Sequence, residues 1–342
     1  MKGTVLVTGA AGFIATHCLL AAHRAGYALR GTLRDLSRGG ELLEVLRRAA
    51  GEPVPVTFVQ ADLTRDDGWD DAVRGCDGVL HVASPLPRVL PRDPEELIRP
   101  AVDGALRVLR AANGVGVRRV VMTSSTAAIC YGRGSLGRPF TERDWSDPES
   151  RDNSSYTRSK THAERAAWEF ARRPDTKLEL VAVNPGAVLG PVLERDYGTS
   201  AEIVLKLLNG DFPGIPDFDF PIVDVRDVAS LHVSALESPN AAGKRYLCVS
   251  GNMTMREIAE ILRVHLPERA AKIPKRELPR WLVRVASLFD PVTRAVVFEL
   301  GIRRECDTRA ARSDLGFSPR PVAESVRDTA DSLVAQRLLS GR

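Results

Sequence analysis

Residues 8–15 read Thr8-Gly9-Ala10-Ala11-Gly12-Phe13-Ile14-Ala15, and the organisation of the whole chain follows from this stretch. It comes directly after an apolar, β-branched run at residues 4–7 and opens a helical pattern over residues 14–25. A buried strand that turns sharply into a helix presents the N–H groups of the helix N-terminus to an anion. The stretch therefore predicts a loop that binds nucleotide phosphates. A plain strand–turn–helix corner is the alternative.

The small residues of this loop have separate roles. Gly9 can take backbone angles that other residues avoid, and Gly12 lets the chain approach a phosphate with no Cβ in the way. Ala15 stands where a third small residue permits close packing of helix against strand. The spacing differs from the commonest dinucleotide fingerprint, G-x-G-x-x-G, so the loop alone does not decide the ligand.

Strand-like and helix-like patterns alternate after the loop. Strands separated by helices imply right-handed crossovers and a parallel sheet that is covered on both faces. The expected strands lie at residues 4–7, 28–33, 54–59, 78–83, 118–123 and 178–183. Two further strands are expected later in the chain, at residues 221–225, where the strand feeds a helix, and at residues 244–249. The predicted fold class is α/β, with a Rossmann-type, doubly wound parallel sheet.

The alternation decays after residue 190, and from residue 254 onward the pattern is mostly helical. We expect a smaller, composite C-terminal lobe whose shape sets substrate choice. The predicted division gives residues 1–185 and 222–250 to an NAD(P)-binding Rossmann domain. It gives residues 186–221 and 251–342 to the substrate-binding lobe.

The composition is that of an ordinary globular chain. Of its 342 residues, 44% are hydrophobic and 27% are charged, and 48 basic against 44 acidic side chains leave a net charge of +4. This near-balance argues against a nucleic-acid partner, and no apolar run approaches the ~20 residues of a membrane span. Five dispersed cysteines indicate reduced thiols and no metal site. We expect a cytoplasmic protein with no membrane partner.

The end of the second expected strand carries information about the cofactor. An enzyme that prefers NAD usually places Asp or Glu there, whereas this chain has Arg34, with Arg38 close behind. A guanidinium suits a ribose 2′-phosphate in charge and in its planar donor fork. The sequence therefore predicts NADP(H) in preference to NAD(H), although Asp35 could reach a ribose.

Two more segments lie where the third and fourth strands end. Asp62-Leu63 is placed to contact an adenine, and the Asp62 carboxylate could accept a hydrogen bond from the adenine amino group. An Asx turn, in which Asp62 caps the next helix, is an equal alternative. His81-Val82-Ala83-Ser84 ends the fourth strand at the carboxyl edge, where open α/β sheets bind ligands. We expect His81 to be a packed strand residue and not a catalyst.

The strongest chemical pattern combines a strand end with a helix. The fifth strand ends in Ser124-Ser125, and Tyr156 and Lys160 follow in a helix, where a spacing of four puts them on one face. A phenol with a reference pKa of about 10 is a poor acid–base catalyst at neutral pH. A neighbouring ammonium lowers that pKa. Ser125 could hold a substrate carbonyl and stabilise the developing alkoxide.

These motifs together resemble the extended short-chain dehydrogenases/reductases over essentially the whole chain, with Asn184-Pro185-Gly186 as a further match. Residues 33–35, 81–85 and 223–229 resemble the dihydroflavonol reductase and cinnamoyl-CoA reductase group. Within this group, the sequence resembles the microbial members more than the others. These microbial members act as NADPH-dependent aldehyde and ketone reductases.

The resemblance implies roles for individual residues. Tyr156 would donate the proton, Lys160 would lower its pKa and bind the nicotinamide ribose, and Ser125 would orient the carbonyl, with Ser124 as a substitute. The implied cofactor-binding residues are Gly9, Gly12, Phe13, Ile14, Arg34, Asp62, Leu63, Val82, Ala83, Thr123, Tyr156, Lys160, Pro185 and Val188. The implied substrate-binding residues are Ser84, Ser125 and Tyr156.

The leading interpretation is an NADPH-dependent carbonyl reductase, reversible as an alcohol dehydrogenase, that acts on a small molecule and needs no metal. Two alternatives stay open: a nucleotide-sugar epimerase/dehydratase or hydroxysteroid dehydrogenase of the same superfamily, and a non-catalytic dinucleotide sensor. We expect a monomer or a homodimer.

Overall fold

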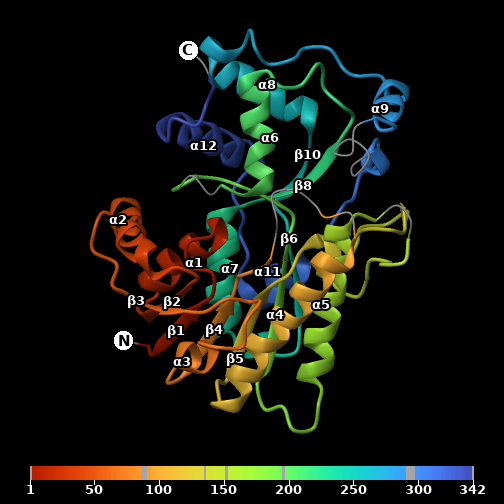
Figure 1. The fold of residues 1–342 in the computed structure, drawn as a ribbon. Helices are drawn as coiled ribbons and strands as arrows, with labels where there is room; N and C mark the ends of the chain where they lie inside the picture. The colour runs from red at the N-terminus through yellow and green to blue at the C-terminus, as the bar shows by residue number, and fades with distance from the viewer. Residues whose placement is uncertain are drawn as a thin grey trace.

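A parallel sheet with helices on both faces forms the lower part of the molecule in Figure 1. The computed structural model describes residues 2–85, 91, 93–134, 136–150, 153–194, 197–289 and 297–340. Within them the sheet has seven strands in the order β3-β2-β1-β4-β5-β6-β9, all parallel. The strands are β1 (Thr4–Val7), β2 (Ala28–Leu33), β3 (Val56–Gln60), β4 (Gly78–His81), β5 (Arg119–Thr123), β6 (Glu179–Pro185) and β9 (Arg245–Cys248).

The two faces of this sheet are covered by separate groups of helices, each with its own apolar core. One core joins the sheet to the helices α1, α2, α7 and α11. The other joins it to α3, α4 and α5. The helices are α1 (Phe13–Arg24), α2 (Gly39–Ala50), α7 (Val225–Glu237), α11 (Arg309–Leu315), α3 (Trp69–Val73), α4 (Glu95–Gly114) and α5 (Ser155–Ala171). This is the doubly wound α/β fold that the alternation predicts.

The strand order reverses between β1 and β4. From β1 the chain proceeds to β2 and β3 on one side, and then returns to β4, β5 and β6 on the other. Such a reversal opens a crevice at the carboxyl ends of the strands, where this class of fold binds its ligands. The glycine loop leaves β1, and residues 82–85 leave β4, on the two sides of this point.

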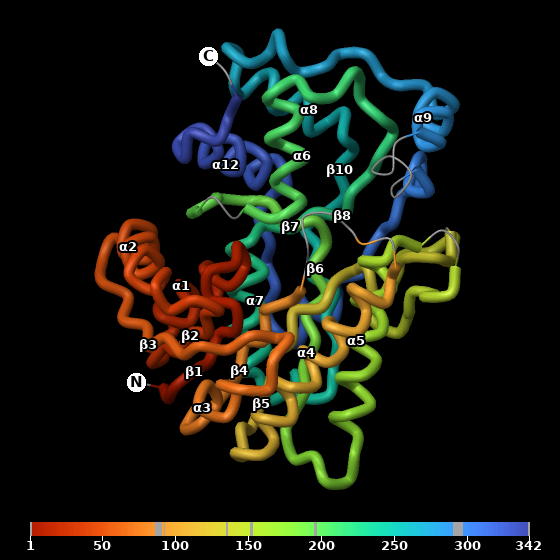
Figure 2. The backbone as a smooth tube through the Cα atoms, viewed as in Figure 1, coloured from red at the N-terminus to blue at the C-terminus, as the bar shows by residue number. Residues whose placement is uncertain are grey.

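A smaller lobe lies above the carboxyl edge of the large sheet (Figure 2). It has a second sheet of three strands, ordered β10-β8-β7, in the described chain. Its core joins these strands to α6, α8 and α12. The elements are β7 (Ala187–Leu189), β8 (Asp219–Asp224), β10 (Gly251–Thr254), α6 (Gly198–Asn209), α8 (Met255–His265), α12 (Val322–Ala335) and the outlying α9 (Arg280–Ala286).

One expected element joins the two parts. Residues 221–225 were predicted as a strand that feeds a helix, and β8 does lead directly into α7. The strand, however, pairs with β7 and β10 of the small sheet, whereas α7 packs against α1 on the large one. The boundary of the two lobes therefore falls inside this strand–helix unit, and the predicted division of domains remains a prediction.

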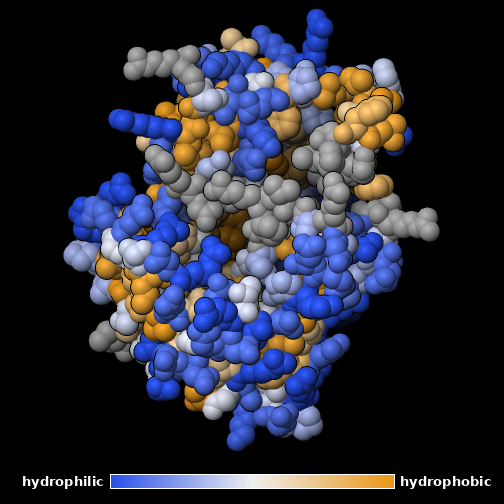
Figure 3. Space-filling view, viewed as in Figure 1, coloured by the Kyte–Doolittle hydropathy of each residue, from blue (hydrophilic) through white to orange (hydrophobic). Residues whose placement is uncertain are grey.

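On the face shown in Figure 3, most of the surface over the large sheet is polar. In the space-filling view, apolar side chains show at the bottom of a hollow between the two lobes (Figure 3). No helix of the described residues is long and apolar enough to cross a membrane.

Candidate active site

The glycine loop has the geometry of an anion cradle. Gly9 takes a φ of +65°, and a Cβ there would lie 3.0 Å from that of Ala83, so only glycine fits. The Gly12 amide donates to the Gly9 carbonyl at 2.8 Å, and Gly12 caps α1. No side chain caps α1 and its first turn carries no acidic residue, so a phosphate meets no competing carboxylate there.

Thr8 fixes this loop to the end of β4. Its hydroxyl oxygen accepts from the Val82 and Ala83 amides at 3.1 and 3.0 Å and lies 2.9 Å from His81 Nδ1. The hydroxyl proton therefore points to the imidazole, which holds His81 in its neutral form. Burial, with a contribution from the Lys160 charge, lowers the pKa of His81 to about 3. His81 is thus a packed strand residue, as expected, and Thr8 is a positioning residue that the sequence analysis missed.

The cationic end of β2 makes three polar interactions. Arg34 is exposed there, and its backbone carbonyl accepts from the Gln60 amide side chain at 2.9 Å. Asp35 uses one carboxylate oxygen to accept from the Ser37 amide at 2.9 Å. Arg38 pairs with Glu194 at 2.9 Å. Of the two arginines, Arg34 therefore remains the candidate for a 2′-phosphate.

Asp62 forms the Asx turn that was one of its two predicted roles. Its Oδ1 accepts from the amide and the hydroxyl of Thr64, both at 2.8 Å. These hydrogen bonds, and to a lesser degree the Arg34 charge, hold the pKa of Asp62 below its usual value. The Leu63 carbonyl accepts from the Arg107 guanidinium on α4 at 2.8 Å. The adenine contact of Asp62 and Leu63 remains a prediction.

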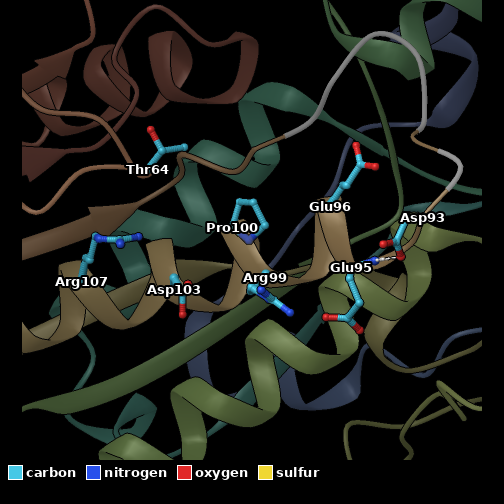
Figure 4. Close-up of a pocket in the computed structure, with 8 residues that line it drawn as sticks. All are labelled: Thr64, Asp93, Glu95, Glu96, Arg99, Pro100, Asp103 and Arg107. Atoms are coloured by element: carbon cyan, nitrogen blue, oxygen red, sulfur yellow. Dashed lines mark hydrogen bonds between the residues drawn. The ribbon is translucent and has the colours of Figure 1, made fainter.

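A surface hollow of about 330 Å³ adjoins this turn along α4 (Figure 4). It is lined by Thr64, Asp93, Glu95, Glu96, Arg99, Pro100, Asp103 and Arg107. None of the predicted catalytic residues lines it, so it is separate from the catalytic centre.

The catalytic candidates meet at the start of α5. Ser154 caps this helix, its Oγ accepting from the Thr157 amide at 3.2 Å, and so places Tyr156 in the first turn. Ser125 caps the short turn at Thr126–Ala128, which packs against α5. Burial raises the pKa of Tyr156, and the Ser125 side chain opposes that shift. The structure thus brings two of the three predicted catalytic residues close together.

Lys160 follows one helical turn later and is 8% exposed. Burial lowers its pKa to about 8, and the Glu164 carboxylate opposes that shift. The effect of Lys160 on the phenol, expected from the sequence, remains a prediction. The Ser124 hydroxyl donates to Glu164 at 2.5 Å, so it is engaged elsewhere, and Ser125 remains the candidate.

Other predicted contact residues surround this pair. Thr123 hydrogen bonds His232 Nε2 at 2.6 Å, while His232 Nδ1 donates to the Val228 carbonyl, so the Thr123 hydroxyl is the donor. Its side chain is therefore committed to α7. Pro185 ends β6 and Val188 lies buried in β7. Ser84 is exposed beyond β4, and its contact with substrate remains a prediction.

The described residues hold no group of three or more His, Cys, Asp or Glu side chains that could bind a metal ion. All five cysteines are free. Two of them are close in space although far apart in sequence, since the sulfur atoms of Cys130 and Cys306 lie 3.8 Å apart.

The doubly wound sheet, the glycine loop at its switch point and the Ser–Tyr–Lys cluster define a dinucleotide-binding α/β protein. The chain belongs to the NAD-dependent epimerase/dehydratase family, the extended short-chain dehydrogenases/reductases, whose family model matches residues 5–248. The resemblance found in the sequence is therefore confirmed.

The chain is also similar, in sequence or in structure, to individual reductases. The chain is 37% identical to cinnamoyl-CoA reductase 1 of Petunia hybrida over 269 residues, 77% of this chain and 78% of that protein. It is 35% identical to dihydroflavonol 4-reductase of Zea mays over 276 residues, 78% of this chain and 75% of that protein. The structure is similar to yeast methylglyoxal/isovaleraldehyde reductase Gre2 complexed with NADPH, with a TM-score of 0.80 and 28% identity, covering 98% of this chain and 99% of that one.

Proposed function

We propose that the chain is an NADPH-dependent carbonyl reductase that converts an aldehyde or ketone to an alcohol. The observation that carries the proposal is the convergence of three side chains: the Tyr156 phenol, the Ser125 side chain that acts on it, and the buried Lys160 one helical turn away. A non-catalytic sensor has no use for a half-buried phenol that lies beside a hydroxyl and an ammonium. The named reductase relatives support an oxidoreductase.

The residues of the chain fit the cofactor. The N-terminus of α1, which no side chain caps, would bind the pyrophosphate, and Arg34 would pair with the 2′-phosphate of NADPH. Lys160 would bind the nicotinamide ribose, and Pro185 and Val188 would flank the nicotinamide. NADPH also agrees with the name of the yeast Gre2 complex. A nicotinamide bound in this way supplies the hydride for the reduction.

The reaction then needs a proton and an oxyanion site from the protein. The Ser125 hydroxyl would donate a hydrogen bond to the substrate carbonyl oxygen and polarise it. Tyr156 would donate its proton to the same oxygen as negative charge develops there. Because burial raises the pKa of Tyr156, the phenol is protonated at neutral pH, as the reduction direction requires. The Lys160 cation would stabilise the phenolate that remains.

Arg34 also weighs against a sugar epimerase, because such enzymes favour tightly held NAD and an acidic residue after the second strand. Asp35 follows Arg34, but one of its carboxylate oxygens is already engaged with the Ser37 amide.

The proposal is tested by following NADPH and NADH oxidation by absorbance against aldehydes, α-diketones, aryl ketones and bulky ketones. The alcohol product is identified by mass spectrometry. We expect turnover with NADPH and much weaker turnover with NADH. Tight dinucleotide binding without oxidation of either cofactor would contradict the proposal.

A further inference from the structure

A buried carboxylate lies behind the catalytic pair. Glu164 is on α5, four residues after Lys160 and eight after Tyr156, so the three side chains follow one another along one face of the helix. Glu164 is 0% exposed. A carboxylate is rarely buried in full without partners, because the loss of hydration is costly.

Glu164 contacts the ends of both strands that carry the site. It accepts from the Ser124 hydroxyl at 2.5 Å and from the Asn184 side-chain amide at 2.7 Å. The same Asn184 amide donates to the backbone carbonyl of Ser125 at 3.1 Å. One carboxylate thus connects α5 to Ser124, the residue that follows β5, and to Asn184 on β6.

Arg245 of β9 compensates the charge of this carboxylate. Its guanidinium donates to the two Glu164 oxygens at 2.5 and 3.2 Å and lies over the Trp145 ring, 3.7 Å from its centre. It also donates to the backbone carbonyls of Glu142 and Asp144. Arg245, together with the hydrogen bonds, keeps the pKa of Glu164 below its usual value despite burial. The carboxylate is therefore ionised at neutral pH.

The other groups near the catalytic pair do not supply this charge. His81, on β4, is neutral because burial, with a contribution from the Lys160 cation, lowers its pKa to about 3. Tyr131, in the loop after β5, is neutral too, because burial, with a small contribution from Tyr156, raises its pKa. Among the described residues, Glu164 is the anion that acts on Lys160, with Arg245 behind it.

We propose that Glu164 is a positioning residue of the reductase site. Its buried carboxylate keeps Lys160 charged, against the opposing charge of the ion-paired Arg245, and holds the Ser124-Ser125 and Asn184-Pro185 strand ends in register with α5. This inference rests on the proposed function. It assigns to Glu164 and Arg245 a part in the proton chemistry that neither the spacing of Tyr156 and Lys160 nor the glycine loop indicates.

The charges of residues 164 and 245 shift the pKa of neighbouring acids in opposite directions. Removing a nearby negative charge makes every neighbouring acid lose its proton more readily, and removing a nearby positive charge does the opposite. Tyr156 and Lys160 must both be protonated for reduction, and they titrate as a pair. The alkaline limb of the reduction profile therefore reports the charge at residues 164 and 245.

The experiment compares Glu164→Gln, Arg245→Met and the matched control Glu169→Gln, which changes an exposed carboxylate on the same helix. The pH profile of kcat/KM is measured for NADPH-dependent reduction. We expect the alkaline limb to move down by about 1 pH unit in Glu164→Gln and up in Arg245→Met. It should stay in place in Glu169→Gln. If the substitutions only loosened the structure, kcat would fall, but the alkaline limbs of Glu164→Gln and Arg245→Met would not move in opposite directions.

A second measurement does not need turnover. The pH dependence of acylation of Lys160, read by mass spectrometry against the exposed Lys272, gives the titration of Lys160 in each folded variant. Its midpoint should fall in Glu164→Gln and rise in Arg245→Met. Unmoved midpoints, or midpoints that move in the same direction, would overturn the role of Glu164. If the native chain lacks turnover, the proposed function fails while the labelling still tests Glu164. If Glu164→Gln does not fold, Arg245→Met alone decides.

Discussion

The Thr8 hydroxyl lies 2.9 Å from His81 Nδ1 and accepts from the amides of Val82 and Ala83, and so joins the glycine loop to the end of β4. This contact crosses the point where the strand order reverses. It holds the two sides of this switch point together, where the dinucleotide would lie.

Thr8→Val keeps the shape of the side chain but removes its hydrogen bonds. It leaves two amides and one imidazole nitrogen without their partner, so we expect a loss of about 2 kcal/mol in the free energy of unfolding. Urea unfolding measures this loss. Thr57→Val, at an exposed position of β3, should change stability by less than about 0.5 kcal/mol. Equal stability of Thr8→Val and the native chain would show that the contact is dispensable.

The buried histidines predict a loss of stability in mild acid. Burial lowers the pKa of His17 and His232 to about 4 and that of His81 to about 3. The unfolded chain takes up these protons below about pH 6.5, whereas the folded chain does not. Stability should therefore fall by about 1 kcal/mol per histidine between pH 6.5 and 5.5.

Chemical unfolding at several pH values measures this slope. In His17→Gln the side-chain amide can still donate to the Pro191 carbonyl that His17 Nε2 contacts at 2.9 Å. The fall should then be smaller by about 1 kcal/mol. A flat profile over this range would contradict the neutral, buried state of the three rings.

The left-handed backbone at Gly9 predicts a position-specific penalty. Gly9→Ala puts a Cβ within 3.2 Å of the Ala83 Cα at a φ of +65°, so we expect a loss of at least about 1 kcal/mol and weaker NADPH binding. Gly40→Ala, in α2 with open space around it, should instead stabilise by about 0.5 kcal/mol. Thermal unfolding compares the two, and equal effects would refute the constraint at Gly9.

Arg34 should strengthen the binding of NADPH but not of NADH, because only NADPH carries the 2′-phosphate. Arg34→Ala removes a charge-assisted interaction and should weaken NADPH binding by at least about tenfold, with little effect on NADH. Fluorescence titration of both cofactors measures the difference, and Arg47→Ala on α2 serves as the control. An equal loss for both cofactors would place Arg34 away from the 2′-phosphate.

The sequence was sufficient to predict the large sheet, because strand periodicity and turn residues are local signals. The choice of which strands pair with one another is not a local signal, because it depends on residues far apart in the sequence. Residues 221–225 look like any buried strand, and only long-range pairing assigns β8 to the small sheet with β7 and β10.

The residues of the site were likewise predictable only in part. Tyr156, Lys160 and Ser125 stand in recognisable motifs, whereas Glu164 looks like one more helix-surface acid. Its burial depends on Arg245, which lies 81 residues away in sequence. The available signal was its spacing, one turn after Lys160 and two after Tyr156.

Tyr156→Phe tests the central claim most directly, by single-turnover NADPH oxidation with the best carbonyl substrate of the panel. The substitution removes the phenolic proton donor and little else, so reduction should fall by about 10²–10⁴-fold. NADPH affinity, measured by fluorescence, should be unchanged. Reduction at the native rate in Tyr156→Phe would show that the proton comes from another group and would contradict the proposed mechanism.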